Sequence, residues 1–284
     1  MNIFEAVVLG IVQGLTEFLP VSSSGHLVLL QKVFGITEPA LFFDTMLHAG
    51  TLLAVFAVLW KDIWAILRRP IQPLTGLLVL ATIPTVIAAL AFKDVIEHAF
   101  ESGQFLGFAF LLTAVLLCAA ELLSKRAACR PTEVGNSSGL KKAHNMNWLD
   151  ALVIGILQAV AIIPGVSRSG ATISGALSRG LDRDFAARFS FLLSIPAILG
   201  ALVLQMKDLV KISAASTAAV SESTQVYSLG AVITGTVSAA IVGFFAIRFM
   251  LKIIKEKSLF GFAIYTAALG VLVLIDQFVT HLVF

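Results

Sequence analysis

The sequence predicts an all-α membrane protein with six transmembrane helices and two re-entrant helical hairpins, arranged as an inverted-topology repeat. Three observations lead to this prediction. Of the 284 residues, 58% are apolar before the 21 glycines are counted, and the mean hydropathy is +0.96. Charged residues make up only 13% of the chain, about half the share found in soluble domains. The third observation is a similarity between two stretches of the chain that interrupt the apolar pattern.

This composition excludes several classes of protein. A soluble enzyme, a disordered chain and a nucleic-acid-binding protein would all need more polar surface than this sequence can supply. The long apolar blocks also argue against a membrane β-barrel, whose short strands alternate apolar and polar residues. The net charge of +3 is typical of basic cytoplasmic loops, so we expect no nucleic-acid partner.

Six apolar stretches approach the roughly 20 residues that a membrane span requires. They cover residues 43–60, 74–92, 105–123, 185–206, 226–251 and 259–278. The loops 61–73 and 124–147 and the loop after residue 251 are rich in Lys and Arg, whereas the loops 93–103 and 207–225 are not. The positive-inside rule then places these loops alternately inside and outside, with both chain termini outside.

Two stretches, 1–38 and 148–184, begin as apolar segments and then break into Pro, Gly, Ser and charged residues. By the same alternation, the second stretch starts and finishes inside, and the first starts and finishes outside. Irregular backbone at membrane depth is tolerated only where it is buried in protein or lines a wet cavity. We therefore expect two re-entrant hairpins that build the functional site.

The two stretches also align with each other. Residues 5–25 match residues 150–170 at a constant offset of 145, with nine identical pairs among 21 and no gaps. Each repeat then holds one hairpin and three spans, and an odd number of crossings inverts the second copy. We expect one polytopic membrane domain, with repeat one over about 1–123, a linker over about 124–147 and repeat two over about 148–284.

Glu17, His26 and Arg168 are ionisable residues that lie where the predicted hairpins dip into the membrane. Ionisable groups at membrane depth are costly, so they are functional candidates. Arg168 offers a planar donor fork suited to phosphate oxygens, and the neighbouring Ser and Gly residues let backbone N–H groups approach an anion. Hydroxyl, imidazole and carboxylate groups together are the usual parts for phosphoryl or acyl transfer.

The same residues have structural interpretations, which the sequence leaves open. Glu17 and Arg168 could form a buried ion pair that holds the hairpins together, and His26 could cap a helix. The serine clusters could serve helix packing and capping. Gln13 and Gln158 occupy equivalent repeat positions and could satisfy broken helical backbone.

Three other polar residues of the spans are expected to be unrelated to the site. Glu121 and Asp276 lie near the ends of spans, where charged groups can reach water. His48 lies early in the first span, and we expect it to lie outside the site.

The segments QGLTEFLPVSSSGH (13–26) and PGVSRSGATISGAL (164–177) resemble the two signature segments of the undecaprenyl-diphosphate phosphatase family of the bacitracin-resistance type. The resemblance extends over essentially the whole chain and includes FSFLLSIPAILG (189–200). It implies hydrolysis of undecaprenyl diphosphate to the monophosphate, which recycles the lipid carrier of cell-wall synthesis and confers resistance to bacitracin. It also implies a bacterial cell (inner) membrane location, and the alternation of the loops directs the site to the outer face.

The resemblance also assigns residues. The family's acidic motif falls on Gln13 and Glu17, its serine and histidine fall on Ser23 and His26, and its arginine falls on Arg168. Many members of the family carry a second carboxylate where this chain has Gln13, which weakens a two-carboxylate metal site. We predict catalytic roles for Glu17, Ser23, His26 and Arg168. The predicted substrate-binding residues are Gln13, Ser22, Ser24, Gly165, Ser167, Ser169 and Thr172.

Several points of this hypothesis stay open at the level of sequence. A divalent cation, Mg²⁺ or Ca²⁺, would be held by Glu17 and by oxygens of the substrate. The nucleophile could be Ser23, His26 or water. A secondary transporter or flippase for a polyprenyl phosphate is the alternative function, because inverted repeats are common in transporters. An anion channel would need a polar path that the spans do not offer. The partners would be the polyprenyl diphosphate and the lipid bilayer, and a homodimer is a further prediction.

Overall fold

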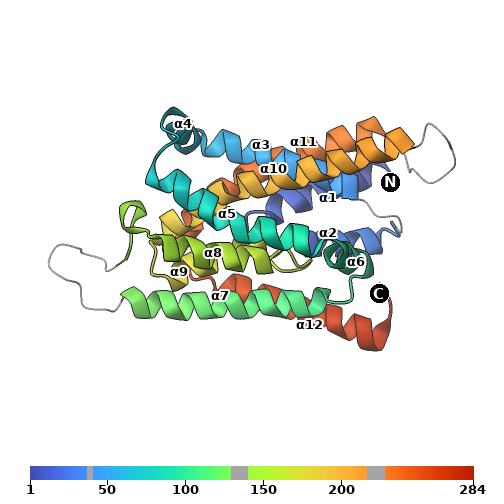
Figure 1. Cartoon of the computed structure of the whole chain (residues 1–284). Helices are drawn as coiled ribbons and strands as arrows, with labels where there is room; N and C mark the ends of the chain where they lie inside the picture. The colour runs from blue at the N-terminus through green and yellow to red at the C-terminus, as the bar shows by residue number, and fades with distance from the viewer. Residues whose placement is uncertain (37–40, 129–139, 216–227) are drawn as a thin grey trace.

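The computed structural model describes residues 1–36, 41–128, 140–215 and 228–284. In these ranges the chain forms a bundle whose long helices lie along a common direction (Figure 1). The α-helices are α1 (Ile3–Thr16), α2 (Ser23–Val33), α3 (Leu41–Val58), α4 (Trp60–Arg68), α5 (Pro73–Ala91), α6 (Lys93–Ser102), α7 (Leu106–Ala128), α8 (Trp148–Val160), α9 (Arg168–Ser178), α10 (Arg183–Ala215), α11 (Leu229–Glu256) and α12 (Phe260–Ile275). Two short elements, η1 (Ala143–Asn145) and η2 (Asp276–Thr280), complete the described secondary structure.

Five of the described helices, α5, α7, α10, α11 and α12, are long and apolar enough to cross a membrane. They coincide with five predicted spans, although α10 continues to Ala215 and so enters the predicted loop 207–225. The sixth predicted span is α3, which passes the same test only together with α4, across a bend of 79°. The all-α membrane fold is thus confirmed, with five or six candidate spans among the described residues. Residues 216–227, which include the predicted start of the fifth span, lie outside the described residues.

Two helices stand where loops were predicted. Helix α4 covers most of loop 61–73, and α6 covers most of loop 93–103. On α4 the rings of Trp60 and Trp64 stack with centroids 5.6 Å apart, and the guanidinium of Arg68 lies over the ring of Trp64. Aromatic and basic side chains favour the membrane–water interface. Short amphipathic helices of this kind escape a search for long apolar runs.

The two predicted hairpins are present. Helices α1 and α2 form the first, and α8 and α9 form the second; each helix is too short to span a membrane. Figure 1 shows the first hairpin in the half of the bundle that holds both chain ends, and the second in the half that holds α4. The hairpins therefore enter the bundle from opposite ends.

Equivalent residues begin the equivalent helices of the two hairpins. Asn2 and Asn147 each form a capping box, at the start of α1 and of α8. Ser22 and Ser167 cap α2 and α9, and each accepts a hydrogen bond from the N–H of a glycine three residues later. Each pair is separated by 145 residues, which is the offset found in the sequence. Side-chain caps satisfy backbone donors that a helix start leaves open, so the repeat has a physical basis.

Small residues bring each hairpin against a span from the other half of the chain. A Cβ atom added to Gly10 on α1 would lie 2.3 Å from the carbonyl oxygen of Gly235 on α11. A Cβ atom added to Gly155 on α8 would lie 2.4 Å from the carbonyl oxygen of Ala81 on α5. Backbones approach this closely only where side chains are absent or small. The two contacts again use equivalent positions, since Gly10 and Gly155 are 145 residues apart.

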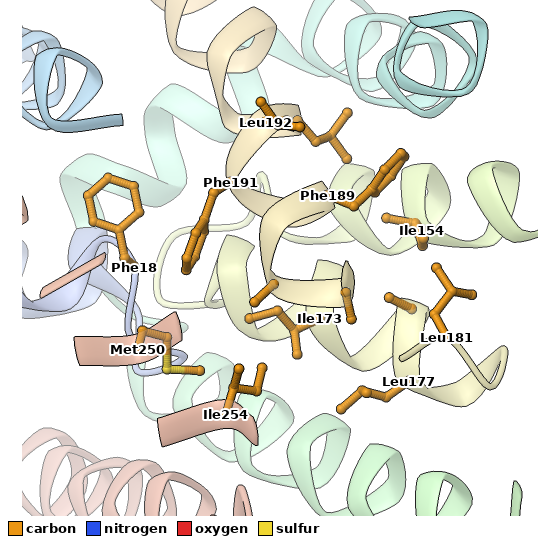
Figure 2. Packing of buried hydrophobic residues seen from close by; sticks show 14 of the residues in the cluster. Phe18, Ile154, Ile173, Leu177, Leu181, Phe189, Phe191, Leu192, Met250 and Ile254 are labelled. Carbon is orange, nitrogen blue, oxygen red and sulfur yellow. The ribbon is translucent and has the colours of Figure 1, made fainter. Parts of the chain in front are cut away.

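The largest hydrophobic core among the described residues gathers around α9 and the first turns of α10, and it includes one residue of the first hairpin turn (Figure 2). Phe18, from the first turn, is fully buried and meets the ring of Phe191 on α10 edge-to-face, with centroids 5.4 Å apart. Ile173 on α9 and Met250 on α11 belong to the same cluster. Close packing of this kind fixes the position of the turn that carries Glu17.

Ion pairs anchor the opposite end of the second hairpin. Asp150 at the start of α8 is fully buried and accepts hydrogen bonds from Lys141 at 2.9 Å and Arg179 at 2.8 Å. Nearby Glu121 is 2% exposed and accepts a hydrogen bond from Arg183 at 2.9 Å. The expectation that Glu121 reaches water is therefore wrong. In the predicted linker, residues 129–139 lie outside the described residues.

Candidate active site

The turns of the two hairpins contact each other inside the bundle. The hydroxyl of Ser169 donates a hydrogen bond to the carbonyl oxygen of Leu19 at 3.0 Å, and the N–H of Gly165 donates one to Ser24 Oγ at 3.3 Å. The first helical residues of α2 and α9 are Ser23 and Arg168. Two helix N-termini therefore meet at one place, where partial positive charge and free N–H groups favour an anion.

The backbone of the first turn is unusual at Ser22. This residue has a φ of 71°, a left-handed conformation that non-glycine residues adopt at some cost. Its side chain caps α2 through the N–H of Gly25 at 3.3 Å. The strained turn directs the next residue, Ser23, toward Glu17.

Glu17 is the centre of a polar cluster formed by both hairpins. The carboxylate is 6% exposed. One oxygen, Oε1, accepts a hydrogen bond from Arg168 Nη2 at 2.5 Å, and the other, Oε2, accepts from Ser23 Oγ at 2.6 Å and from Gln13 Nε2 at 2.9 Å. Charge-assisted hydrogen bonds of this length are strong. They connect three of the four predicted catalytic residues.

The cluster opens into a cavity of about 320 Å³. Its polar wall contains Glu17, Ser23 and Arg168, and its apolar wall is formed by α10 and by the turn before α9. The described residues that line it are Glu17, Ser23, Ser24, Leu27, Asp44, Thr45, His48, Ala161, Ile162, Val166, Ser167, Arg168, Ala197, Ile198 and Ala201. A polar end beside an apolar wall suits an amphiphile with an anionic head.

The expectation for His48 is wrong, because this side chain lines the cavity. Its Nε2 lies 3.5 Å from Glu17 Oε2, and Asp44 lies one turn earlier on the same face of α3. A signal for this was present in the sequence. Polar residues at 44, 48 and 51 repeat at helical spacing in an otherwise apolar span, and such a stripe faces the protein interior rather than lipid.

His26 faces away from the cavity. Its Nδ1 is 2.6 Å from the carbonyl oxygen of Ser22, and its Nε2 is 2.7 Å from the hydroxyl of Tyr265 on α12. The two rings stack with centroids 5.7 Å apart. These two contacts engage both ring nitrogens. They connect His26 to the strained turn at Ser22 and to α12, and not to Glu17. Its acid–base role stays a prediction.

The predicted substrate-binding residues fall into two groups. Ser24 and Ser167 line the cavity. Thr172 is fully buried, and its hydroxyl lies 2.6 Å from that of Ser190, whose carbonyl oxygen accepts a hydrogen bond from Arg168 Nη1 at 3.3 Å. Thr172 therefore contacts Ser190, the residue whose carbonyl oxygen holds the guanidinium of Arg168. Of the others, Gln13 donates to Glu17, while Ser22, Gly165 and Ser169 shape the turns.

The residues around Glu17 do not form a cation site as they stand. No group of three His, Cys, Asp or Glu side chains that could hold a metal ion occurs among the described residues. Both oxygens of Glu17 already accept hydrogen bonds from Arg168, Ser23 and Gln13. Binding of Mg²⁺ or Ca²⁺ by Glu17 stays a prediction, and no chemical step below depends on it.

Comparison with known proteins gives the family. The model of the bacitracin resistance protein BacA family matches residues 6–272. The chain belongs to the BacA family. Relatives of this BacA-family chain include undecaprenyl-diphosphatase of Carboxydothermus hydrogenoformans, 45% identical over 98% of both chains, and undecaprenyl-diphosphatase 3 of Bacillus cereus, 44% identical over 98% of both. The undecaprenyl-diphosphatase of Halothermothrix orenii is 39% identical, and the match covers 97% of this BacA-family chain and 98% of the relative's length.

Proposed function

We propose that the chain is an integral-membrane phosphatase that hydrolyses undecaprenyl diphosphate to undecaprenyl phosphate and inorganic phosphate. The reaction recycles the lipid carrier of cell-wall synthesis and so confers bacitracin resistance. Membership of the BacA family and the names of the relatives support this activity. The observation that carries it is the contact of Glu17 with Ser23 and Arg168 where two helix N-termini meet.

The polar cluster can perform the chemistry with the chain's own residues. We propose that Ser23 Oγ attacks the terminal phosphorus while Glu17 Oε2, 2.6 Å away, takes the hydroxyl proton. The bond from phosphorus to the bridging oxygen breaks, and the lipid monophosphate leaves. Arg168 and the first N–H groups of α2 and α9 neutralise the charge on the transferring phosphoryl group. Water then cleaves the phosphoserine and releases inorganic phosphate.

The apolar wall of the cavity suits the isoprenoid tail. Ala197, Ile198 and Ala201 on α10 line it with apolar side chains. An apolar wall of this kind, with two alanines, leaves room for a hydrocarbon chain that continues into the bilayer. The lipid part of the substrate can therefore stay in the membrane while the diphosphate reaches Ser23.

We propose that the protein lies in the bacterial cell (inner) membrane, with its active site open to the outer face. The positive-inside rule favours a cytoplasmic location for the basic end of the bundle, where α4 lies, and an outer location for the end that holds both termini. The cavity extends from the hairpin turns to the first turns of α3, at Asp44 and Thr45, which supports an opening toward the outer end.

We also propose the repeat boundaries at about 1–123, 124–147 and 148–284. The equivalent caps and the equivalent glycine contacts of the two hairpins support them. A homodimer stays a prediction that the mass of the detergent-solubilised protein would test.

The proposed activity is tested with the purified protein in detergent. It should release inorganic phosphate from farnesyl diphosphate, a soluble polyprenyl diphosphate. The protein should also be reconstituted in vesicles with a labelled polyprenyl phosphate. Movement of the labelled lipid across the bilayer without any phosphate release would favour the transporter or flippase alternative and overturn the phosphatase.

The contact between Tyr265 and His26 gives a further prediction. In Tyr265→Phe the ring stack stays, but one hydrogen bond of about 1 kcal/mol is lost, so the turn at Ser22 is held less firmly. The kcat for farnesyl diphosphate should fall about three- to tenfold while KM changes little, because the cavity wall is untouched. A proportional rise in KM would contradict a role in positioning the turn.

A further inference from the structure

We propose that His48 is a further substrate-contacting residue, which as the imidazolium donates a hydrogen bond from Nε2 to an oxygen of the diphosphate. The inference rests on the proposed phosphatase function and adds a binding residue that the signature segments do not contain. His48 lies on α3, 22 residues beyond the end of the first segment.

The first step is that His48 is accessible from the cavity. Its side chain lines the cavity and is 29% exposed, whereas that of Glu17 is 5% exposed. A ligand that enters the cavity therefore meets the imidazole before it reaches the carboxylate.

The second step is that the imidazole has a fixed orientation. Its Nδ1 lies 2.7 Å from the carbonyl oxygen of Asp44, one helical turn earlier, and can only donate to it. With that proton on Nδ1, Nε2 donates only when the ring is the imidazolium, so the proposed contact with the diphosphate is made by the cationic form of His48. The contact with Asp44 directs Nε2 into the cavity. There Nε2 lies 3.5 Å from Glu17 Oε2, which is long for a hydrogen bond. A phosphate oxygen placed between α3 and the turn that carries Glu17 would offer Nε2 of His48 a closer acceptor.

The third step concerns charge. Among the described residues that line the cavity, Arg168 and His48 are the two with side-chain nitrogen donors. Arg168 is already paired with Glu17, and Asp44 adds a second carboxyl group, hydrogen-bonded to Gln31 at 2.7 Å. The negative charge of a diphosphate exceeds the positive charge that Arg168 and two helix N-termini supply together. A second cationic donor, His48 on α3, completes the anion site.

The fourth step is the placement of the two donors around Ser23. Ser23, Arg168 and His48 all contact or approach the same carboxylate, that of Glu17, from three different helices. A phosphoryl group beside Ser23 is therefore within reach of α9 on one side and of α3 on the other.

The variants that separate these ideas are His48→Leu, which removes the donor at similar size, and His48→Gln, whose amide can still donate. In detergent, His48→Leu should raise the KM for farnesyl diphosphate and the Kd for inorganic pyrophosphate by at least about tenfold, or 1.4 kcal/mol. Its kcat should stay within about threefold of wild type, and His48→Gln should stay within about threefold in all three constants. His98→Leu, on the exposed face of α6, is the matched control and should leave all three unchanged.

Two readouts keep this inference separable from the proposed function. Failure of the wild-type protein to release phosphate would overturn the phosphatase assignment. The Kd for inorganic pyrophosphate would still test the role of His48, because it does not depend on turnover. Values of KM and Kd for His48→Leu within threefold of wild type would overturn the role of His48, and so would a His48→Gln variant as weak as His48→Leu. If thermal unfolding shows that His48→Leu does not fold, His48→Ala takes its place. The same tenfold rises in KM and Kd are expected for His48→Ala, and values within threefold of wild type would again overturn the proposal.

Discussion

Arg168→Ala should lower phosphate release from a polyprenyl diphosphate by at least about 100-fold. Arg168 contacts the same carboxylate as the reacting serine, and loss of one charged donor of this kind typically costs two to three orders of magnitude. The substitution also leaves the buried Glu17 without its ion-pair partner, which has a cost of about 3–5 kcal/mol when a buried pair is broken. We therefore expect a lower unfolding temperature together with the loss of activity, both measured in detergent.

Two matched variants separate the chemistry from the stability. Arg168→Lys keeps the positive charge but not the planar fork, so it should recover most of the stability and little of the activity. Arg188→Ala removes an arginine of α10 that pairs with Asp62 and Asp184 and does not line the cavity. It should keep activity within about threefold of wild type. An Arg168→Ala protein that hydrolyses substrate at a near-normal rate would refute the role assigned to Arg168.

Ser23→Ala should abolish turnover more completely, with a loss of at least about 1,000-fold. The reason is that the hydroxyl that donates a hydrogen bond to Glu17 at 2.6 Å is the proposed nucleophile, and alanine has no hydroxyl to replace it. Rapidly quenched wild-type protein should yield a peptide phosphorylated at Ser23, detected by mass spectrometry.

The control for this variant is Ser178→Ala. Ser178 ends α9, donates to the carbonyl oxygen of Gly175 and lies far from the hairpin turns along its helix. Activity of this control should match wild type. A Ser23→Ala protein that loses activity, combined with a phosphorylated histidine in the wild-type protein, would move the nucleophile to an imidazole. Absence of any phosphorylated peptide would leave Ser23 to orient water.

The sequence predicted those parts of the fold that depend on long-range composition. Apolar runs located five spans as helices, and the 145-residue offset located two hairpins whose caps proved equivalent. A buried ion pair between Glu17 and Arg168 was one alternative that the sequence left open, and the structure contains that pair. The structural interpretation of this pair and the catalytic one are compatible, since the same contact holds the hairpins together and orients the carboxylate.

The parts that sequence reasoning missed depend on which side of a helix a residue faces. His26 belongs to a signature segment, yet its ring contacts Ser22 and Tyr265; Tyr265 is 239 residues later in the chain. His48 lies in an apolar span, yet it faces Glu17. A short motif does not determine such rotations, because they follow from packing against distant helices. The bend between α3 and α4 was not predicted for a related reason, because a break of one residue leaves the apolar run of the sequence almost intact.

The contact between Gly10 and Gly235 has a consequence for biogenesis. Helix α1 is synthesised well before α11, against which it packs. Until α11 is inserted, the buried amide of Gln13 and the carboxylate of Glu17 have no finished interior to enter. The first hairpin can therefore reach its final packing only after α11 has been inserted. The second hairpin packs against α5, which precedes it in the chain, so we expect the second hairpin to reach its final position before the first.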